Sequence, residues 1–314
     1  MKNEFYRDFI RSDHVISEHN SLFKTDITLV SYIGDQIIKV DEHEQNMTVL
    51  SGRLSVLEKA FGITPNKSQR LFLNNMIPNP KQSTAGGETT YTDITHSEDI
   101  FNGGDGNPNK FNSFTNYFCI GNGGENPNTP YAILDVKDWE TRLYSMVPFR
   151  FVDESADIPA EEQKQYRLRK VVQLTTDSGP KRYIAYYAKK FDPGKVFSMK
   201  SGAEYTPEIE DSNPYIGDGT GHPMQGQTSQ IYIQFELEVT DKEFKEFYRA
   251  THNNTTTGAR LTELGLISGY DAPNTQDVSR NELANATLFA KLVHDPVFMS
   301  SEGSRRKVTY KIFA

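Results

Sequence analysis

The chain has 314 residues, with 34 Lys and Arg against 42 Asp and Glu, and a net charge of −8. The length allows about two domains, and the acidic balance argues against a nucleic-acid-binding protein, which normally carries a basic stripe. Apolar residues are only 36% of the chain, yet it contains 16 Tyr and 19 Phe. Disordered chains are poor in aromatics, whereas aromatics among polar turn residues favour strands. We therefore predict a mainly β protein with long polar loops.

The sequence also limits the cellular setting. No apolar run approaches the ~18 residues of a membrane span, and the opening MKNEFYRDFIRSDH lacks the apolar core of a signal peptide. The single cysteine, Cys119, follows Tyr117 and Phe118. We expect it to be a small buried apolar group and not a nucleophile, which would want a nearby His and an electropositive setting. The expected protein is made in the cytoplasm and has no membrane or nucleic-acid partner.

Residues 1–82 are predicted to form a helical or extended attachment segment. Between Asp26 and Phe61 the apolar residues recur at steps of three and four, with a slip near Glu44. This pattern predicts one long amphipathic helix, or two helices broken near residues 41–46. The stripe either packs on its own domain or forms a seam between subunits, and we favour the seam. The expected oligomer interface then comprises Ile33, Ile37, Val40, Met47, Leu50, Leu54, Leu57 and Phe61.

Two long polar segments, 83–111 and 203–228, interrupt the chain. Both are rich in Gly and Asp and poor in apolar residues. Ordering a backbone costs about 1–2 kcal/mol per residue, which such segments cannot offset by burying their own side chains. We predict surface loops that become ordered only through neighbouring molecules.

From residue 112 to 314 we predict an antiparallel β-sandwich-like body with an insertion around 153–230. Apolar and polar residues alternate along 230–239, which is typical of a strand with one buried face. A turn around Gly179 predicts a hairpin. Further strands are expected at 114–120, 144–152, 169–175, 182–188, 288–293 and 307–313, and short helices at 241–248 and 281–286.

No residue pattern points to catalysis or to a bound cofactor. The His residues include no pair at the spacing of a helical metal site. Asp105 and Asp218 open Asp-Gly turns without the alternating oxygen ligands of a calcium loop. Gly121–Gly124 lacks the Lys-Ser/Thr pair of a phosphate loop. Two acids could meet in space as a glycosidase pair, but nothing singles out such a pair. We expect a non-enzymatic protein without metal or cofactor.

Five features, read in order, resemble the attachment domain of the tail-collar fibre proteins of tailed bacteriophages. They are YFCIGNGG at 117–124; ETRLY at 140–144, followed by Pro148-Phe149-Arg150; the alternating strand at 231–239; LTELGLI at 261–267; and LFA at 288–290, followed by Asp295-Pro296 and a final strand ending at Phe313. The similarity covers residues 112–314. It implies docking onto a virion. It also implies scaffold roles: Gly121, Gly123, Gly124 and Gly265 would turn strands, and Glu263 would hydrogen-bond neighbouring backbone or pair with a cation.

The chain departs from that family at 152–230, which looks like an insertion, and in its N-terminal helix and loop. It also stops where a fibre protein would continue into shaft repeats and a tip. We therefore expect a structural adapter of the virion tail, at the baseplate, collar or fibre-attachment region. It would be a homo-oligomer, assembled in the host cytoplasm, that joins other virion proteins. Three alternatives stay open: a head–tail neck or capsid-surface protein, a carbohydrate-binding protein that contacts the host through Trp139 and tyrosines, and a glycan depolymerase.

Overall fold

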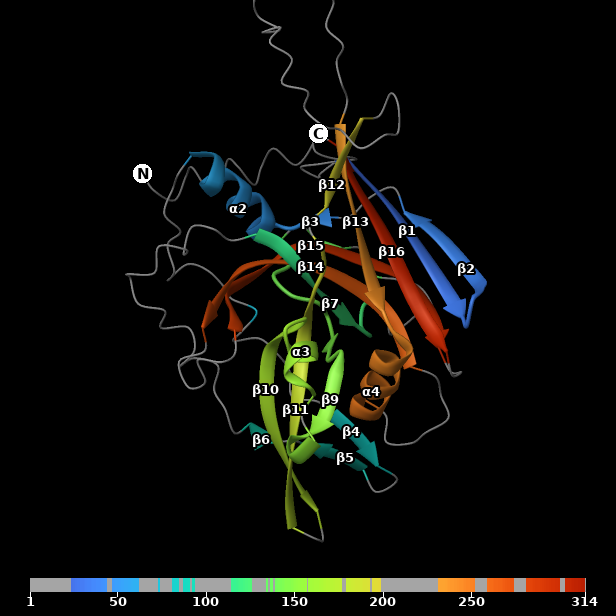
Figure 1. The fold of residues 1–314 in the computed structure, drawn as a ribbon, viewed down its shortest axis with the longest axis vertical. Coiled ribbons are helices and arrows are strands. Elements are labelled where there is room, and N and C mark those ends of the chain that lie inside the picture. The colour runs from blue at the N-terminus through green and yellow to red at the C-terminus, as the bar shows by residue number, and fades with distance from the viewer. Residues whose placement is uncertain are drawn as a thin grey trace, which may run out of the picture.

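The computed structural model (Figure 1) describes residues 24–43, 47–61, 73, 81–84, 87–90, 92–93, 114–125, 134, 136–137, 139–156, 158–176, 179–192, 194–198, 231–251, 259–273, 281–299 and 303–313. The strands of this part all pair antiparallel, so the mainly β, antiparallel fold predicted from the sequence is confirmed. A five-stranded sheet has the order β12 (Lys195–Ser198), β13 (Ile231–Val239), β16 (Ser304–Phe313), β1 (Lys24–Ile33) and β2 (Gln36–His43).

A nine-stranded sheet forms the rest of the body. Its main path is β3 (Met47–Thr48), β15 (Asn281–Met299), β14 (Ala259–Pro273), β7 (Phe114–Gly121), β11 (Gly179–Lys190), β10 (Tyr166–Thr176) and β6 (Thr92–Asp93). In addition, β8 (Met146–Val147) pairs with β7, and β9 (Arg150–Asp153) pairs with β11. β4 (Lys81–Thr84) and β5 (Gly87–Thr90) form a separate pair. The described helices include α2 (Leu50–Phe61), α3 (Ala160–Gln163), α4 (Asp241–Thr251) and a 3-10 turn at Glu154–Ala156.

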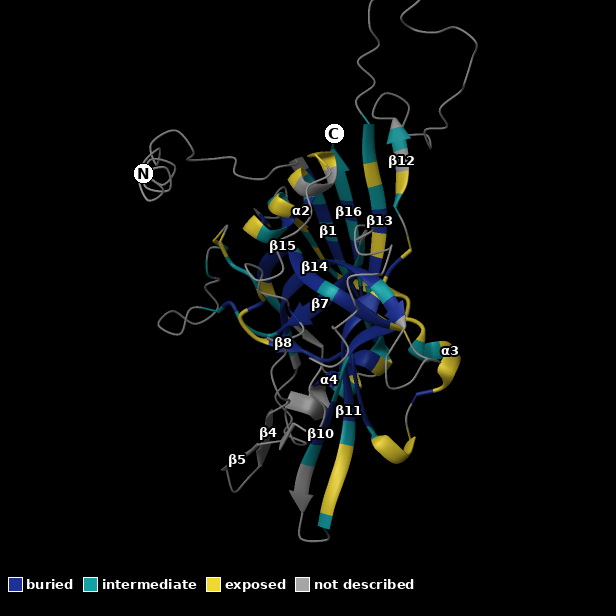
Figure 2. Ribbon diagram, turned by 90° about the vertical axis from the view of Figure 1, so that its left-hand side faces the viewer, coloured by how far each residue is buried: buried dark blue, intermediate teal, exposed yellow. Residues whose placement is uncertain are grey.

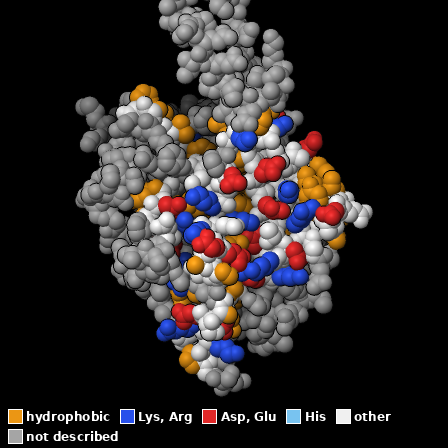
Figure 3. Space-filling model, viewed as in Figure 1, with side chains coloured by type: hydrophobic (Ala, Val, Ile, Leu, Met, Phe, Trp, Pro, Cys, Tyr) orange, Lys and Arg blue, Asp and Glu red, His pale blue; other side chains and the backbone are white. Residues whose placement is uncertain are grey.

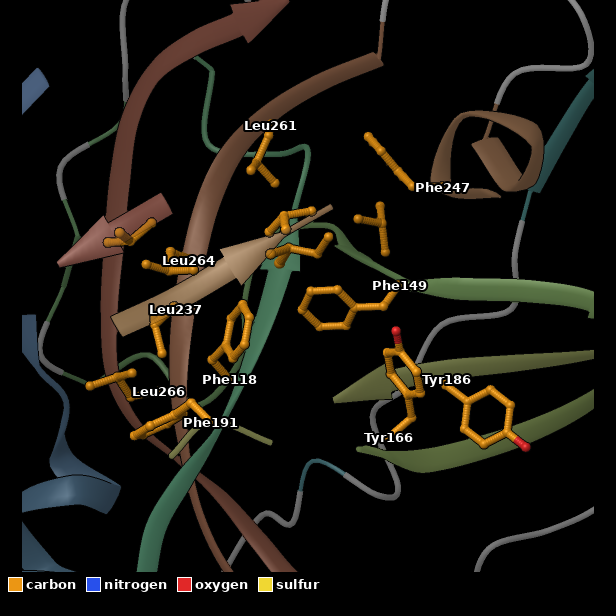
Figure 4. Close-up of a cluster of buried hydrophobic side chains, with 14 of the residues drawn as sticks. Phe118, Phe149, Tyr166, Tyr186, Phe191, Leu237, Phe247, Leu261, Leu264 and Leu266 are labelled. Atoms are coloured by element: carbon orange, nitrogen blue, oxygen red, sulfur yellow. The ribbon is translucent and has the colours of Figure 1, made fainter. Parts of the chain in front are cut away.

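The two large sheets share one hydrophobic core. Ile27 from β1 and Leu237 from β13 belong to the same buried cluster as Phe118 from β7 and Leu264 from β14. Figure 4 shows Phe118 and Phe149 side by side in this cluster, with their ring centroids 5.0 Å apart in an edge-on arrangement. Such aromatic pairs add to the stabilisation that burial of their area provides. The β-sandwich-like packing therefore rests on aliphatic and aromatic side chains from both sheets.

The nine-stranded sheet is buried on both faces around β7. Phe118 and Ile120 face the first core, whereas Tyr117 and Cys119 belong to a second cluster on the opposite face, with Leu288 of β15. This explains the continuous apolar run YFCI, because a strand buried on both sides has no polar face to alternate with. Figure 2 shows β7, β14 and β15 as largely buried strands, while β11 is exposed near its start.

The predicted helix from Asp26 to Phe61 is wrong over its first half. Residues 24–43 form the β1–β2 hairpin, and only Leu50–Phe61 is helical. In β1 the buried residues are Thr25, Ile27, Leu29 and Ser31, so burial alternates with a period of two, as in a strand. Two of these residues are polar, and a search for apolar residues alone does not detect them. Gly34 completes the hairpin at φ +58°, a left-handed conformation that glycine adopts without strain.

Three further expectations are corrected. The helix at 281–286 is wrong, because Asn281 begins β15, whose backbone hydrogen bonds go to β14. The predicted strand at 144–152 is interrupted at Pro148, and its halves β8 and β9 pair with different neighbours. The loop interpretation of 83–111 is wrong where the end of β4, β5 and β6 form. The remainder of that segment, and all of 203–228, lies outside the described residues.

Most other local predictions are confirmed. The strands at 114–120, 230–239, 288–293 and 307–313 correspond to β7, β13, part of β15 and β16, and the helix at 241–248 to α4. The hairpin around Gly179 is β10–β11, in register from Tyr166↔Lys189 to Thr176↔Gly179. Residues 153–230, which the resemblance led us to expect as an insertion, contribute β10 and β11 to one large sheet and β12 to the other. Among the described residues, no helix is long and apolar enough to cross a membrane.

Candidate functional site

Helix α2 packs on the body through its smallest side chains. Gly52 lies so close to β15 that a Cβ built on it would fall 2.1 Å from the carbonyl oxygen of Phe289. Ser55, on the same side, is buried, and the hydroxyl of Ser51 donates to the carbonyl of Leu288. The backbone N–H of Val49 donates to the Phe289 carbonyl at 3.2 Å. The helix is therefore held by backbone proximity and hydrogen bonds.

The large apolar side chains of α2 point away from the body. Leu50, Leu54, Leu57 and Phe61 are 49%, 42%, 49% and 74% exposed. At about 100° per residue they lie within roughly 60° of one another and opposite Gly52. An amphipathic helix on a globular protein normally turns its apolar stripe inward. Here the direction is reversed, and these four residues, the α2 stripe, face solvent.

A second exposed apolar set lies on the β1–β2 hairpin. Ile33, Ile37, Ile38 and Val40, the hairpin patch, are 41%, 55%, 45% and 52% exposed. Figure 3 shows hydrophobic side chains gathered over this hairpin. The α2 stripe and the hairpin patch lie on different sides of the molecule (Figure 1). The other predicted interface residues thus divide between two surfaces and do not form one helical seam. The backbone of Met47 begins β3 and pairs with Lys291.

The predicted scaffold residues converge on Glu263 of β14. Its carboxylate is fully buried and accepts three backbone N–H bonds: from Tyr144 at 2.7 Å, from Ser145 at 2.9 Å and from Gly123 at 3.0 Å. These donors belong to the ends of two connections that lead into β8 and out of β7. Glu263 therefore ties the glycine turn after β7 to the segment before β8.

Lys291 of β15 supplies the cation beside this carboxylate. Its ammonium lies 3.3 Å from Glu263, with both side chains fully buried, and 2.7 Å from Glu140. It also lies 3.2 Å from the centroid of the Tyr144 ring, a cation–π contact. The buried charges are thus compensated on several sides, as a low-dielectric setting requires. Glu263 hydrogen-bonds the backbone and pairs with a cation at the same time.

Glycines make room for the Glu263 carboxylate. A Cβ on Gly121 would lie 2.5 Å from Glu263 Oε2 and 2.7 Å from the Ser145 carbonyl, and one on Gly123 would lie 2.8 Å from the same Oε2. Gly265 is enclosed by the side chains of Leu288 and Cys119, and Gly124 has φ +80°. These positions require glycine for close approach, and at Gly124 also for backbone conformation.

A second buried polar cluster, which no sequence pattern indicated, joins α4 to β9. Arg150 is 2% exposed; its Nε donates to Glu246 at 2.8 Å, and a further guanidinium nitrogen donates to Glu162. The same Glu246 oxygen accepts the backbone N–H of Phe151 at 2.9 Å. Burial alone would lower the pKa of Arg150, but the bonds to Glu246 outweigh it and hold that pKa above its usual value. Arg150 therefore stays charged and fixes α4 on the sheet.

Glu243 caps α4 and closes this cluster. It accepts the N–H of Thr240 at 2.7 Å, while its own N–H donates to the Thr240 hydroxyl, a reciprocal cap of the helix N-terminus. Its carboxylate also accepts the Tyr166 hydroxyl at 2.6 Å and pairs with Lys189 at 2.8 Å. Burial and the Glu243 charge raise the pKa of Tyr166, so its phenol remains a donor. Every oxygen of Glu243 is occupied.

Asp271 of β14 holds a third cluster. It accepts Arg167 Nε at 2.8 Å and the Tyr117 hydroxyl at 2.5 Å, and Lys190 lies 3.6 Å away. Burial would raise the pKa of Asp271, but the hydrogen bonds from Arg167 and Tyr117 outweigh it and hold that pKa below its usual range. These bonds link β7, β10 and β14 within the nine-stranded sheet.

Arg306 is the least compensated buried charge in the described chain. It is fully buried on β16, its guanidinium nitrogens make no hydrogen bond within the described part, and Asp41 of β2 lies 3.6 Å away. Burial lowers the pKa of Arg306 to about 10, against the attraction of Asp41.

Burial also raises the pKa of the Cys119 thiol, with Glu263 adding to the effect. A thiol in this state is a poor nucleophile.

These arrangements are those of a β scaffold braced by buried polar clusters, with two apolar surfaces on its outside. Among the described residues, no three His, Cys, Asp or Glu side chains are grouped to hold a metal ion. The chain belongs to a family of unknown function (DUF7208), which matches residues 99–287, more than half of its length. The Glu263 cluster lies within this range apart from Lys291, whereas α2 and the β1–β2 hairpin lie outside it. No curated protein and no solved structure matches the chain.

Proposed function

We propose that the protein is a non-enzymatic structural adapter of a bacteriophage virion, which joins neighbouring particle proteins through the α2 stripe and the hairpin patch. The observation that carries the proposal is the reversed amphipathicity of α2. Its four largest apolar side chains are between 42% and 74% exposed, while its small residues face the body. Grouped apolar side chains on a surface mark sites of protein association.

The energy that the α2 stripe offers is sufficient for a specific contact. Burying the exposed half of one leucine contributes about 1 kcal/mol at roughly 25 cal/mol per Å². The four side chains together contribute about 4–5 kcal/mol on the same scale. A row of apolar residues along about 16 Å of helix fits a groove or a second helix on a partner, the mode in which amphipathic helices are recognised.

Occupied carboxylates support a structural role over a catalytic one. Glu263 accepts three backbone N–H bonds and pairs with Lys291, and Glu243 accepts bonds at both oxygens. A general acid or base must reach a substrate proton, whereas these groups are enclosed. Each of them holds neighbouring segments in place.

The virion setting rests on the resemblance to tail-collar attachment domains, whose motifs at 117–124 and 261–267 meet here around Glu263. Within the particle we place the protein in the tail, at the baseplate, collar or fibre-attachment region. A position in the head–tail neck or on the capsid surface uses the same apolar surfaces and is the alternative for location. A particle reconstruction distinguishes these positions.

Binding of a host carbohydrate is the second candidate. Trp139 is 66% exposed and Tyr144, five residues on, is 42% exposed. Aromatic rings present flat apolar faces on which a sugar ring can stack. Lys291 already occupies one face of Tyr144, so a sugar would use the other face together with Trp139. Glycan-array binding that is lost on Trp139→Ala would favour this role.

The adapter role is tested by replacing Leu54 and Leu57 together with Asp and supplying the variant to a phage that lacks the gene. We expect the folded variant to be absent from purified particles, because two charges replace the centre of the α2 stripe. The control is Ile233→Asp, which introduces one Asp at a 42%-exposed residue outside both surfaces and should still be incorporated. If the α2 variant enters particles as the wild type does, the α2 stripe is not a docking surface.

A further inference from the structure

We propose that two copies of this chain pair antiparallel through strand β2, with Val40 on the two-fold axis, and so join their five-stranded sheets into one continuous sheet. The inference rests on the proposed adapter role and names a second copy as the partner of the hairpin patch. The α2 stripe is left for a different virion protein.

Strand β2 is an open edge. It is the last strand in the order of the five-stranded sheet, and among the described strands only β1 pairs with it, from Ile27↔His43 to Ile33↔Gln36. The other side of β2 presents backbone N–H and C=O groups that no described strand uses, which is a template for strand addition. Ile37, Ile38 and Val40 on this strand are 55%, 45% and 52% exposed.

The sequence of β2 is complementary to itself in the register centred on Val40. When a strand pairs with its own copy about a two-fold axis perpendicular to the sheet, a central residue faces itself. A residue n positions before the centre then faces the residue n positions after the centre in the other copy. With Val40 at the centre, Val40 faces Val40 and Lys39 faces Asp41 of the other copy, twice by symmetry. Centring on Lys39 or on Asp41 would place like charges directly opposite, which is destabilising.

Lysine on an edge strand usually opposes strand addition, but here its charge is matched. Lys39 and Asp41 already lie 2.9 Å apart within the chain, on one face of β2, and are 39% and 17% exposed. In the proposed pair each Lys39 would lie between two carboxylates. Asp41 is also 3.6 Å from Arg306, so the Lys39, Asp41 and Arg306 side chains of the two copies would place opposite charges next to one another across the joint.

The irregularity of the hairpin leaves this register intact. The pairing of β1 with β2 shifts between Ser31 and Tyr32, so that Ile38 is the extra residue. From Lys39 to His43 the pairing with β1 is regular. The central pairs of the proposed joint, Val40 with Val40 and Lys39 with Asp41, therefore fall on regular strand, and the two Val40 side chains lie side by side on one face of the sheet.

Cysteine cross-linking of the full-length chain tests both the partner and the register. Opposite residues in an antiparallel pair have Cα atoms about 4.5–5.5 Å apart, within the range a disulfide spans. Under mild oxidation we expect Val40→Cys to give a covalent dimer on non-reducing gels. Glu42→Cys alone should not, because its copies are displaced by four residues, about 13 Å. The native Cys119 is buried and gives no background.

Two further experiments test the register and the charge pairing separately. A mixture of Ile38→Cys chains with Glu42→Cys chains should cross-link, since these residues face each other, although neither does so alone. Adding Lys39→Glu to Val40→Cys should reduce the yield at least about tenfold, because two like-charge pairs replace two opposite ones. Analytical ultracentrifugation of the wild type and of Lys39→Glu should show a dimer and a monomer, respectively.

The inference fails if Val40→Cys gives no dimer, or if Glu42→Cys alone cross-links as well as Val40→Cys does, since the register would then be wrong. Its failure is separable from that of the adapter role. Suppose that the chain with both Leu54→Asp and Leu57→Asp is absent from particles while Val40→Cys stays monomeric. The α2 stripe is then supported as a docking surface, and pairing through β2 is refuted. If Val40→Cys cross-links while the α2 variant is incorporated normally, pairing through β2 is supported and docking through the α2 stripe is refuted.

Discussion

Replacing Glu263 with Gln should destabilise the protein by about 3 kcal/mol, although the two side chains are nearly isosteric. Gln has a single acceptor oxygen. Placed at the Oε2 position, this oxygen keeps the N–H bonds of Gly123 and Ser145. The amide nitrogen then meets two other donors, the Tyr144 N–H, which lies 2.7 Å from Oε1, and the Lys291 ammonium, which lies 3.3 Å from it. Each buried donor that loses its acceptor costs about 1–3 kcal/mol.

The matched variant is Lys291→Met, which removes the cation and leaves Glu263 with its three backbone donors. We expect it to cost about half as much as Glu263→Gln. The double variant should fall short of the sum by about 1 kcal/mol, since the two residues interact directly. Urea denaturation followed by circular dichroism measures these differences, and a loss of about 3 kcal/mol lowers Tm by roughly 6–12 °C. A Glu263→Gln protein within about 0.5 kcal/mol of the wild type would show that the buried carboxylate does not brace the fold.

Three other predictions follow from particular contacts. Gly52→Ala should destabilise the docking of α2 by about 1–2 kcal/mol, because the new Cβ would lie 2.1 Å from the Phe289 carbonyl oxygen, and hydrogen exchange in α2 should rise. Asp271→Asn should lower stability at pH 7. The pKa of Asp271 is lower in the folded chain than in the unfolded chain, where it is about 3.9. The difference in unfolding free energy between wild type and variant should therefore vanish as pH falls through the folded-state pKa. Unfolding measured over a series of acid pH values tests this. Arg306→Met should leave stability unchanged or raise it, although Arg306 is fully buried, because burial of the guanidinium outweighs its attraction to Asp41, and Asp41 keeps its pair with Lys39 at 2.9 Å; a loss above about 2 kcal/mol would contradict this reasoning.

Local patterns predicted those elements whose buried faces are apolar. In β13 the alternation placed Phe235, Leu237 and Val239 inside, and all three are buried, whereas Ile233 on the same face is 42% exposed. The β1–β2 hairpin was missed for the converse reason. Two of the buried positions of β1 are Thr25 and Ser31, so the count of apolar residues followed the wrong period. For α2 the helical spacing was predicted correctly. Spacing alone does not determine which side of a helix faces the protein, and in α2 that side carries the small residues.

The buried polar clusters show a different limit of the sequence. Glu263 was predicted from a motif, yet its donors at Gly123 and Tyr144 are 140 and 119 residues away. Arg150 with Glu246, and Arg167 with Asp271, are separated by 96 and 104 residues, with no local signal to connect them. Such pairs are brought together by strand order, which one sequence does not reveal. The apolar alternation that determines a strand carries no information about its neighbours in the sheet.

The Glu263 cluster and the α2 stripe are linked through one short stretch of β15. Lys291 pairs with Glu263, and its neighbours Phe289 and Leu288 provide the carbonyl oxygens that hold α2. Strand β3, which leads into α2, pairs with the same stretch at Ala290 and Lys291. A helix that packs through Gly52 lies directly against the backbone of β15, so its position depends on how firmly this part of β15 is held. The buried ion pair fixes that stretch, and a fixed backbone in turn presents the α2 stripe in one orientation, which lowers the entropic cost of docking it onto a partner.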